Sequence, residues 1–207
     1  MGVEEHELPV SNKKRIRLFD FIKREGIVFE HVKLSSSVET DYYYDIKRVA
    51  LSRDGLDLLG ELLLQEMTAY APRSVGGLEM GAIPLATAVM TKSTGVDEYK
   101  LGLDSFFIRK NPKTHGLEKK IEGKLTPPAV IVDDVITSGQ SVMDAINAVN
   151  ALGYNVKAVV CVVDREEDGT PNVLKENQIK YSSLFKHSEF KPFIEEQLKK
   201  KQKIQSS

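Results

Sequence analysis

The sequence is poor in cysteine, with one thiol at Cys161 among 207 residues, and it holds four scattered histidines. A lone cysteine excludes a disulfide framework within the chain. Because Cys161 lies in an apolar stretch, we expect a small buried side chain and not a catalytic thiol. The histidines His6, His31, His115 and His187 lack metal-ligand spacing, which argues against a zinc site built by the protein. A reducing, cytoplasmic setting is the expectation.

Long apolar runs and an excess of either charge are also missing. No run approaches the roughly 20 apolar residues of a membrane-spanning helix. The formal net charge is −1, from 29 basic and 30 acidic residues, which gives no support to a nucleic acid or a membrane surface as partner. The first ten residues have neither a basic region nor an apolar core, so we expect no signal peptide. The length favours one domain with a small appendage.

The segment 129–141, AVIVDDVITSGQS, is the most informative part of the sequence. Its small and β-branched residues 129–132 predict a buried strand of a parallel sheet. Asp133 and Asp134 follow. Successive side chains at a strand end point to opposite faces, so we expect the two carboxylates to have different roles.

The next residues predict a loop that binds phosphate. They are Thr137, Ser138, Gly139, Gln140 and Ser141, and an apolar period typical of a helix begins directly after them. Gly139 permits backbone angles that turn several N–H groups to one side, and a helix N-terminus favours anions. An ordinary strand, loop and helix with acidic surface residues is the competing interpretation. The loop is not a Walker motif, because no Lys follows the glycine at the required spacing.

Strands and helices alternate through the rest of the chain. The patterns predict strands at 28–32, 74–78, 103–108, 156–163 and 179–185, and helices at 12–25, 55–70, 83–91, 170–177 and 192–200. Such alternation implies an α/β fold with a doubly wound parallel sheet and helices on both faces.

Three further segments have both a structural and a functional interpretation. Tyr42–Tyr44 are either a half-buried strand or a wall over a planar ligand. The charged segment Arg109–Lys124 is either a solvated loop or a lid that carries cations to a polyanion. The sequence D-R-E-E-D-G at 164–169 is either an acidic turn or part of a ligand site at the carboxyl edge of the sheet.

These motifs together resemble the orotate phosphoribosyltransferases, a family of type I phosphoribosyltransferases. The resemblance rests on the segment 129–141, on Y-Y-x-D-I-K-R from Tyr42, on R-K-x-x-K-x-H-G from Arg109, and on D-R-x-E-x-G from Asp164. It implies one domain over 1–207, with a hood over roughly 1–50 and an α/β core over 51–207. It also implies a Mg²⁺-dependent pentosyltransferase that converts orotate and phosphoribosyl diphosphate to orotidine 5′-monophosphate. A homodimer that shares its lid across the interface is part of this expectation, with no nucleic acid and no membrane as partner.

The resemblance also implies a role for individual residues. The 5-phosphate would lie on the loop 137–141, and Arg165 would contact the orotate carboxylate. Asp133 and Asp134 would hold the ribose hydroxyls and order a Mg²⁺ that is bound mainly through the substrate. The residues of the lid that would meet the diphosphate are Arg109, Lys110, Lys113 and His115, of which the last three count as catalytic together with the two acids.

The sequence departs from the family pattern at two places, and alternatives stay open. Many members carry a basic residue where this chain has Met80-Gly81, and Lys, Arg and Gly where it has the serine run at 34–40. A purine or uracil phosphoribosyltransferase is one alternative, although a neutral base needs no Arg165. A non-enzymatic regulator that senses phosphoribosyl diphosphate is the other, although no nucleic-acid-binding module is evident.

Overall fold

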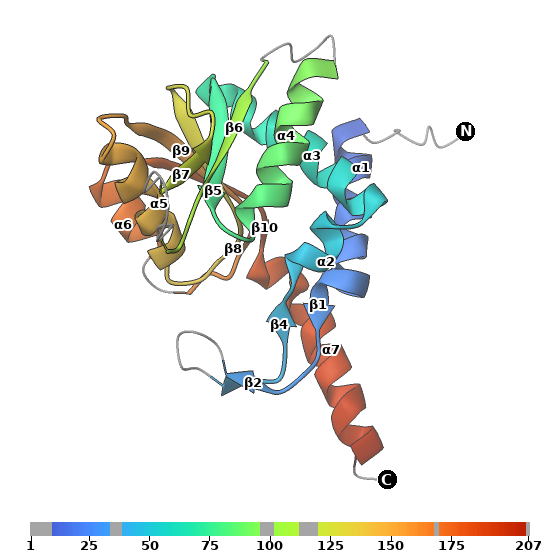
Figure 1. The fold of residues 1–207 in the computed structure, drawn as a ribbon. Coiled ribbons are helices and arrows are strands. Elements are labelled where there is room, and N and C mark those ends of the chain that lie inside the picture. The colour runs from blue at the N-terminus through green and yellow to red at the C-terminus, as the bar shows by residue number, and fades with distance from the viewer. Residues whose placement is uncertain (1–9, 34–38, 96–101, 112–119, 168–169, 206–207) are drawn as a thin grey trace, which may run out of the picture.

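A six-stranded sheet forms the centre of the molecule, in the order β10-β9-β8-β5-β6-β7 (Figure 1). The computed structural model describes residues 10–33, 39–95, 102–111, 120–167 and 170–205. The strands are β5 (Ser74–Leu78), β6 (Asp104–Ile108), β7 (Ile121–Gly123), β8 (Ala129–Ile136), β9 (Val156–Asp164) and β10 (Lys180–Lys186). All neighbours pair in parallel except β7, which is antiparallel to β6. The predicted α/β fold with a parallel sheet is confirmed, with an antiparallel strand added at one edge.

Helices cover both faces of this sheet because its strands bury side chains on both sides. In β8, Val130 and Val132 belong to one buried cluster, while Ala129 and Ile131 belong to the other. The first cluster includes α3 (Arg53–Met67) and α4 (Ala82–Gly95), and the second includes α5 (Gln140–Asn150) and α6 (Thr170–Glu176). The near-continuous apolar runs of β8 and β9 follow from this two-sided burial.

Strand β7 lies inside the segment Arg109–Lys124, for which the sequence predicted no regular structure. Backbone pairing joins Ile108 to Ile121 and Phe106 to Gly123. The prediction was wrong at this point because a strand of three residues, with charged neighbours on both sides, is too short to show an alternating pattern.

Several helix boundaries also differ from the prediction. The first helix, α1 (Val10–Phe21), gives way at Ile22 to one turn of π-helix, η1 (Ile22–Gly26), where a single helix over 12–25 was expected. The last helix, α7 (His187–Gln205), begins five residues before Pro192, where the sequence predicted its start. Ser52 caps α3, since its Oγ accepts a hydrogen bond from the Gly55 N–H at 3.2 Å. A short 3₁₀ turn, η2 (Thr68–Tyr70), follows α3.

The N-terminal part forms two small antiparallel pairs of strands next to the sheet. Strand β1 (Ile27–Val28) pairs with β4 (Tyr43–Tyr44), and β2 (Val32–Lys33) pairs with β3 (Glu39–Thr40), so the single strand predicted at 28–32 is two strands with a bend between them. The short helix α2 (Ile46–Ala50) follows and was not predicted. Helix α7 runs beside this region, where Phe193 lies 6.1 Å from Phe29, ring to ring (Figure 1). We call 27–50 the hood.

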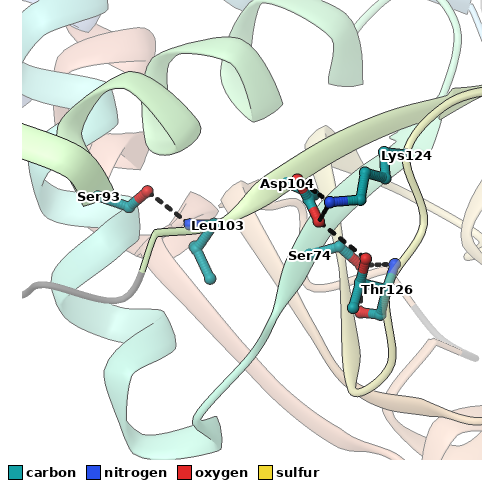
Figure 2. Close-up of polar contacts among 6 residues, drawn as sticks. All are labelled: Ser74, Ser93, Leu103, Asp104, Lys124 and Thr126. Atoms are coloured by element: carbon teal, nitrogen blue, oxygen red, sulfur yellow. Dashed lines mark hydrogen bonds and ion pairs between the residues drawn. The ribbon is translucent and has the colours of Figure 1, made fainter.

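The amino ends of the central strands are tied together by polar contacts (Figure 2). Ser74, at the start of β5, donates to the Thr126 carbonyl at 2.8 Å and accepts from the Thr126 N–H at 3.1 Å. The Thr126 hydroxyl also donates to Asp104, at the start of β6, at 2.8 Å. On the same edge, the fully buried Ser93 hydroxyl accepts from the Leu103 N–H at 2.9 Å. These hydrogen bonds hold the amino ends of β5 and β6 to the segment that precedes β8.

Candidate active site

The strand order reverses between β5 and β8, which makes their carboxyl ends a natural ligand crevice. These two strands are parallel neighbours, while β6 lies beyond β5 and β9 lies beyond β8. A cavity of about 460 Å³ opens at this point. The residues that line it are Tyr43, Tyr44, Lys47, Leu78, Glu79, Met80, Gly81, Lys110, Asp133, Asp134, Val135, Thr137, Ser141 and Arg165.

The two adjacent acids of β8 occupy different environments. Asp133 is 7% exposed, and its carboxylate accepts from the Ser141 hydroxyl at 2.8 Å and from the Asp134 N–H at 3.0 Å. Burial, and then the negative charge of Asp134, raise the pKa of Asp133 to about 7. Asp134 is more exposed and accepts from the Val135 N–H at 3.0 Å. The expectation that the two carboxylates differ is met by this difference in burial.

The loop after β8 leads directly into α5. Gly139 has φ +78°, in the left-handed region, and stands just before the first residue of the helix. Thr137 and Ser141 line the cavity, whereas Ser138, Gly139 and Gln140 are not among its lining residues. The Gln140 amide donates to Asp144 on its own helix at 2.8 Å.

The turn after β5 approaches Asp134 closely. A Cβ atom at Gly81 would lie 2.5 Å from Asp134 Oδ1, so only glycine leaves that carboxylate its present place. The Glu79–Met80 peptide bond is cis. Glu79 accepts a hydrogen bond from the Lys110 N–H at 2.9 Å, which joins this turn to the end of β6.

Of the four lid residues chosen from the sequence, one reaches the cavity in the described part of the chain. Lys110 lines the cavity. Arg109 instead forms an ion pair with Glu122 of β7 at 3.2 Å, and its guanidinium lies 5.5 Å from the Phe107 ring centroid. Lys113 and His115 lie outside the described residues.

The hood and Arg165, which directly follows β9, supply the opposite wall. Arg165 has a side chain that is only 10% exposed, and it forms an ion pair with Glu167 at 2.8 Å. Its guanidinium lies 5.8 Å from the centroid of the Tyr42 ring. Tyr44 is buried, which raises the pKa of its phenol, and its hydroxyl lies 2.9 Å from His187 Nδ1. His187 is the first residue of α7, so the end of the chain supports this wall.

Sequence reasoning missed two of these residues. Lys47, in the first turn of α2, lines the cavity and forms an ion pair with Asp134 at 3.9 Å. Lys47 is part of the Y-Y-x-D-I-K-R motif, but no role of its own was predicted for it from the sequence. The sequence spacing of His187 argued only against a metal site. Its contact with the Tyr44 hydroxyl has no signal in the sequence, because the two residues are 143 positions apart.

Comparison with known proteins identifies the family. No protein-family model matches the chain. The orotate phosphoribosyltransferase of Aquifex aeolicus is 38% identical over 159 residues, which cover 76% of this chain and 85% of that protein. That of Rhodopirellula baltica is 35% identical over 167 residues, covering 77% and 85%. The chain belongs to the orotate phosphoribosyltransferase family.

Solved structures of orotate phosphoribosyltransferases agree with this assignment. The Mycobacterium tuberculosis enzyme in complex with phosphoribosyl diphosphate superposes with a TM-score of 0.70. It is 30% identical, and the match covers 84% of this chain and 97% of that chain. The adenine phosphoribosyltransferase of Leishmania donovani shares the fold, with a TM-score of 0.58, at 14% identity. The fold is therefore common to enzymes for different bases, and the sequence relationship is what identifies orotate phosphoribosyltransferase. The predicted family and enzyme class, a pentosyltransferase of pyrimidine biosynthesis, are confirmed.

No group of three or more His, Cys, Asp or Glu side chains among the described residues could hold a metal ion. None of the helices in this part of the chain is both long and apolar enough to cross a membrane.

Proposed function

We propose that the residues of this cavity transfer the 5-phosphoribosyl group of phosphoribosyl diphosphate to N1 of orotate. The products are orotidine 5′-monophosphate and diphosphate. The observation that supports this most is that one cavity is lined by the paired acids, by Thr137 and Ser141, and by the buried cation Arg165. These are the groups needed for a ribose, a phosphate and a carboxylated base.

The loop between β8 and α5 binds the 5-phosphate in this proposal. Thr137 and Ser141 line the cavity, and the N–H groups from Ser138 to Ser141 stand at the N-terminus of an 11-residue helix. Such an end favours negative charge. Gln140 contributes through its backbone, because its side chain binds Asp144.

The ribose hydroxyls are assigned to the two acids. Asp134 is the more exposed carboxylate and faces the cavity, so it accepts from the hydroxyls directly. Asp133 is held by Ser141 and by the Asp134 N–H, and it fixes the position of the loop as well as lining the ribose site.

A Mg²⁺ ion fits this donor set only together with substrate. Mg²⁺ takes oxygen ligands and is often held by one or two carboxylates plus substrate phosphates. Asp134, with Asp133 behind it, offers such oxygens at the cavity. When bound, the ion neutralises charge on the departing diphosphate.

Orotate differs from other bases by its carboxylate, and Arg165 is the group assigned to it. A buried guanidinium binds a planar carboxylate strongly through paired hydrogen bonds. Tyr43 and Tyr44 form the neighbouring wall for the planar ring.

The lid residues are assigned to the diphosphate. As the bond to the sugar breaks, positive charge develops on the ribose and negative charge on the leaving group. Lys110, Lys113 and Arg109 supply positive charge, and His115 donates a proton or hydrogen bond to the leaving oxygen. A closed lid keeps water from the sugar cation. We propose a homodimer that shares this lid, in a reducing, cytoplasmic setting that suits the free, buried Cys161.

A panel of bases tests the proposed function. Orotate, uracil, adenine, hypoxanthine and guanine are each incubated with the enzyme, phosphoribosyl diphosphate and Mg²⁺, and product is followed by ultraviolet absorbance. We expect turnover with orotate. Turnover of uracil or a purine in its place would indicate another phosphoribosyltransferase, and binding of phosphoribosyl diphosphate without any turnover would indicate a regulator.

Arg165→Gln tests the base assignment separately. We expect the KM for orotate to rise at least about tenfold, since a charge-assisted hydrogen bond contributes about 1.5–3 kcal/mol. The affinity for phosphoribosyl diphosphate, measured by calorimetry, should change little. Equal losses for both substrates would contradict this role of Arg165.

A further inference from the structure

The turn after β5 brings no cation to a site that must bind a highly charged anion. Its residues are Glu79, Met80 and Gly81, and Gly81 lies against the Asp134 carboxylate. Glu79 and the two acids of β8 add further negative charge to the cavity wall. A diphosphate bound here requires positive side chains from other elements.

Three cationic side chains line the cavity among the described residues: Lys47, Lys110 and Arg165. Arg165 lies beside Tyr42 and is paired with Glu167. Lys110 stands at the end of β6, and its backbone is fixed to Glu79. Lys47 differs from both because it comes from the hood and contacts one of the acids assigned to the ribose.

The position of Lys47 keeps a charged ammonium group at the mouth of the cavity. Its Nζ lies 3.1 Å from Asp45 Oδ1 and 3.9 Å from Asp134 Oδ2. Burial opposes its charge, but the Asp45 carboxylate and then that of Asp134 raise the pKa of Lys47 above its usual value. The side chain is 48% exposed, so it is free to turn from Asp134 toward a ligand.

We propose that Lys47 is a substrate-binding residue that holds the diphosphate group of phosphoribosyl diphosphate. This rests on the proposed function. Lys47 and Gly81 both contact the Asp134 carboxylate, so the ammonium group lies within one side chain of the turn that brings no cation. In the absence of substrate, Lys47 neutralises Asp134. When diphosphate enters, the ammonium binds its oxygens and draws the hood over the bound substrate.

The test compares two ligands that represent the two ends of the substrate. Inorganic diphosphate with Mg²⁺ and ribose 5-phosphate are titrated by calorimetry into the wild type, Lys47→Gln and Lys47→Arg. We expect Lys47→Gln to weaken diphosphate binding at least about tenfold, and ribose 5-phosphate binding by less than about twofold. Lys47→Arg should retain most of the diphosphate affinity because it keeps the charge.

Arg48→Gln is the matched control. Arg48 follows Lys47 in the same short helix, is exposed and is not among the residues that line the cavity. Its replacement removes the same charge from α2, so unchanged diphosphate binding in this variant excludes a general effect of hood charge.

Two results would overturn the proposal. One is unchanged diphosphate binding in Lys47→Gln. The other is an equal loss for both ligands, which would mean that Lys47 only clamps the hood to the core. Failure of the wild type to use orotate would refute the proposed function. The comparison of diphosphate and ribose 5-phosphate binding would still test the role of Lys47.

A second measurement uses the wild type alone, in case Lys47→Gln does not fold. Lysines are acetylated with a chemical reagent, and the labelling of Lys47 is followed by peptide mass spectrometry. Inorganic diphosphate with Mg²⁺ should protect Lys47, and ribose 5-phosphate should not. Absence of protection by diphosphate would contradict the proposal.

Discussion

At the scale of single residues, the site depends on two neighbouring carboxylates that the fold treats differently. Asp133 is buried beneath the cavity and Asp134 is partly open to it. A buried acid is costly to ionise, so Asp133 is a group that serves the site at the expense of stability.

The first prediction concerns the pH dependence that follows. Because the folded state raises the pKa of Asp133 from 3.8 to about 7, the contribution of this carboxyl to stability is full below pH 3.8 and is lost as pH rises to about 7. We therefore expect Asp133→Asn to gain stability relative to the wild type as pH rises from 3.8 to about 7, by an amount on the order of a few kcal/mol at most.

Thermal unfolding at several pH values measures this difference. Asp20→Asn, on the exposed side of α1, controls for the loss of one negative charge. A constant difference between Asp133→Asn and the wild type across this range would contradict the prediction. Turnover by Asp133→Asn should fall at least about tenfold.

The second prediction concerns Gly81. A methyl group there would lie 2.5 Å from Asp134 Oδ1, so Gly81→Ala must displace that carboxylate. Since the Asp134 side chain is partly exposed and can rotate, we expect the melting temperature to change little while kcat/KM for phosphoribosyl diphosphate falls at least about tenfold. Steady-state kinetics and a melting curve check both parts. Full activity in this variant would rule out the assigned role of Asp134.

Single residues were predictable from the sequence where their partners are close in the chain. Asp133 and Ser141 are eight positions apart, and local strand, loop and helix patterns are enough to bring them together. Lys47 and Arg109 have partners on other elements, Asp134 and Glu122. Local spacing does not encode such contacts. Lys47 was therefore given no role from the sequence, and Arg109 was assigned to the cavity although it pairs with Glu122.

At the scale of elements, the hood is held to the core by the start of α7. His187 lies 2.9 Å from the Tyr44 hydroxyl through Nδ1, and its ring stacks against Tyr42 at 5.9 Å between centroids. Burial, and then the positive charge of Arg165, lower the pKa of His187, so the imidazole is neutral at neutral pH. Its contribution to stability is therefore present above the ordinary pKa of 6.5 and is lost as pH falls below it.

The third prediction removes this contact. His187→Ala leaves the buried Tyr44 hydroxyl without its partner, so we expect a loss of about 1–3 kcal/mol in unfolding free energy. The KM for orotate should rise because Tyr44 lines the cavity. Urea unfolding and kinetics measure the two effects. His31→Ala, at an exposed histidine of the hood, is the control and should leave both values nearly unchanged. An unaltered KM in His187→Ala would argue against support of the base wall by α7.

Element boundaries show where sequence patterns lose information. Strands β8 and β9 were predictable because they are long and apolar on both faces. The strands of the hood have two residues each, and β7 has three, so neither apolar period nor length marks them. Their formation depends on backbone pairing with distant segments, which a local pattern does not contain.

At the scale of the whole molecule, the apolar interior is shared between the hood and the α/β part of the chain. One buried cluster includes Leu18 of α1, Tyr44 of the hood, Val132 of β8 and Phe190 of α7. We propose that hood and core fold as one unit on this basis.

The fourth prediction tests the proposed dimer with a shared lid. If Lys113 acts in the partner's site, Lys113→Ala and Asp134→Ala are each inactive, and a mixture of the two contains dimers with one intact site. Equal mixing after subunit exchange should restore about one quarter of wild-type activity, because half of the dimers are mixed and each has one complete site. Activity is assayed after dissociation and reassociation of the two variants. Absence of any recovery, with mixed dimers demonstrated by mass spectrometry, would place the lid in its own subunit's site.

The contact between Tyr44 and His187 also has a consequence for biosynthesis. The two residues are 143 positions apart, so a nascent chain that has already emerged past β9 still lacks one support of its base wall. That wall therefore closes only after α7 has been synthesised and has packed against the hood.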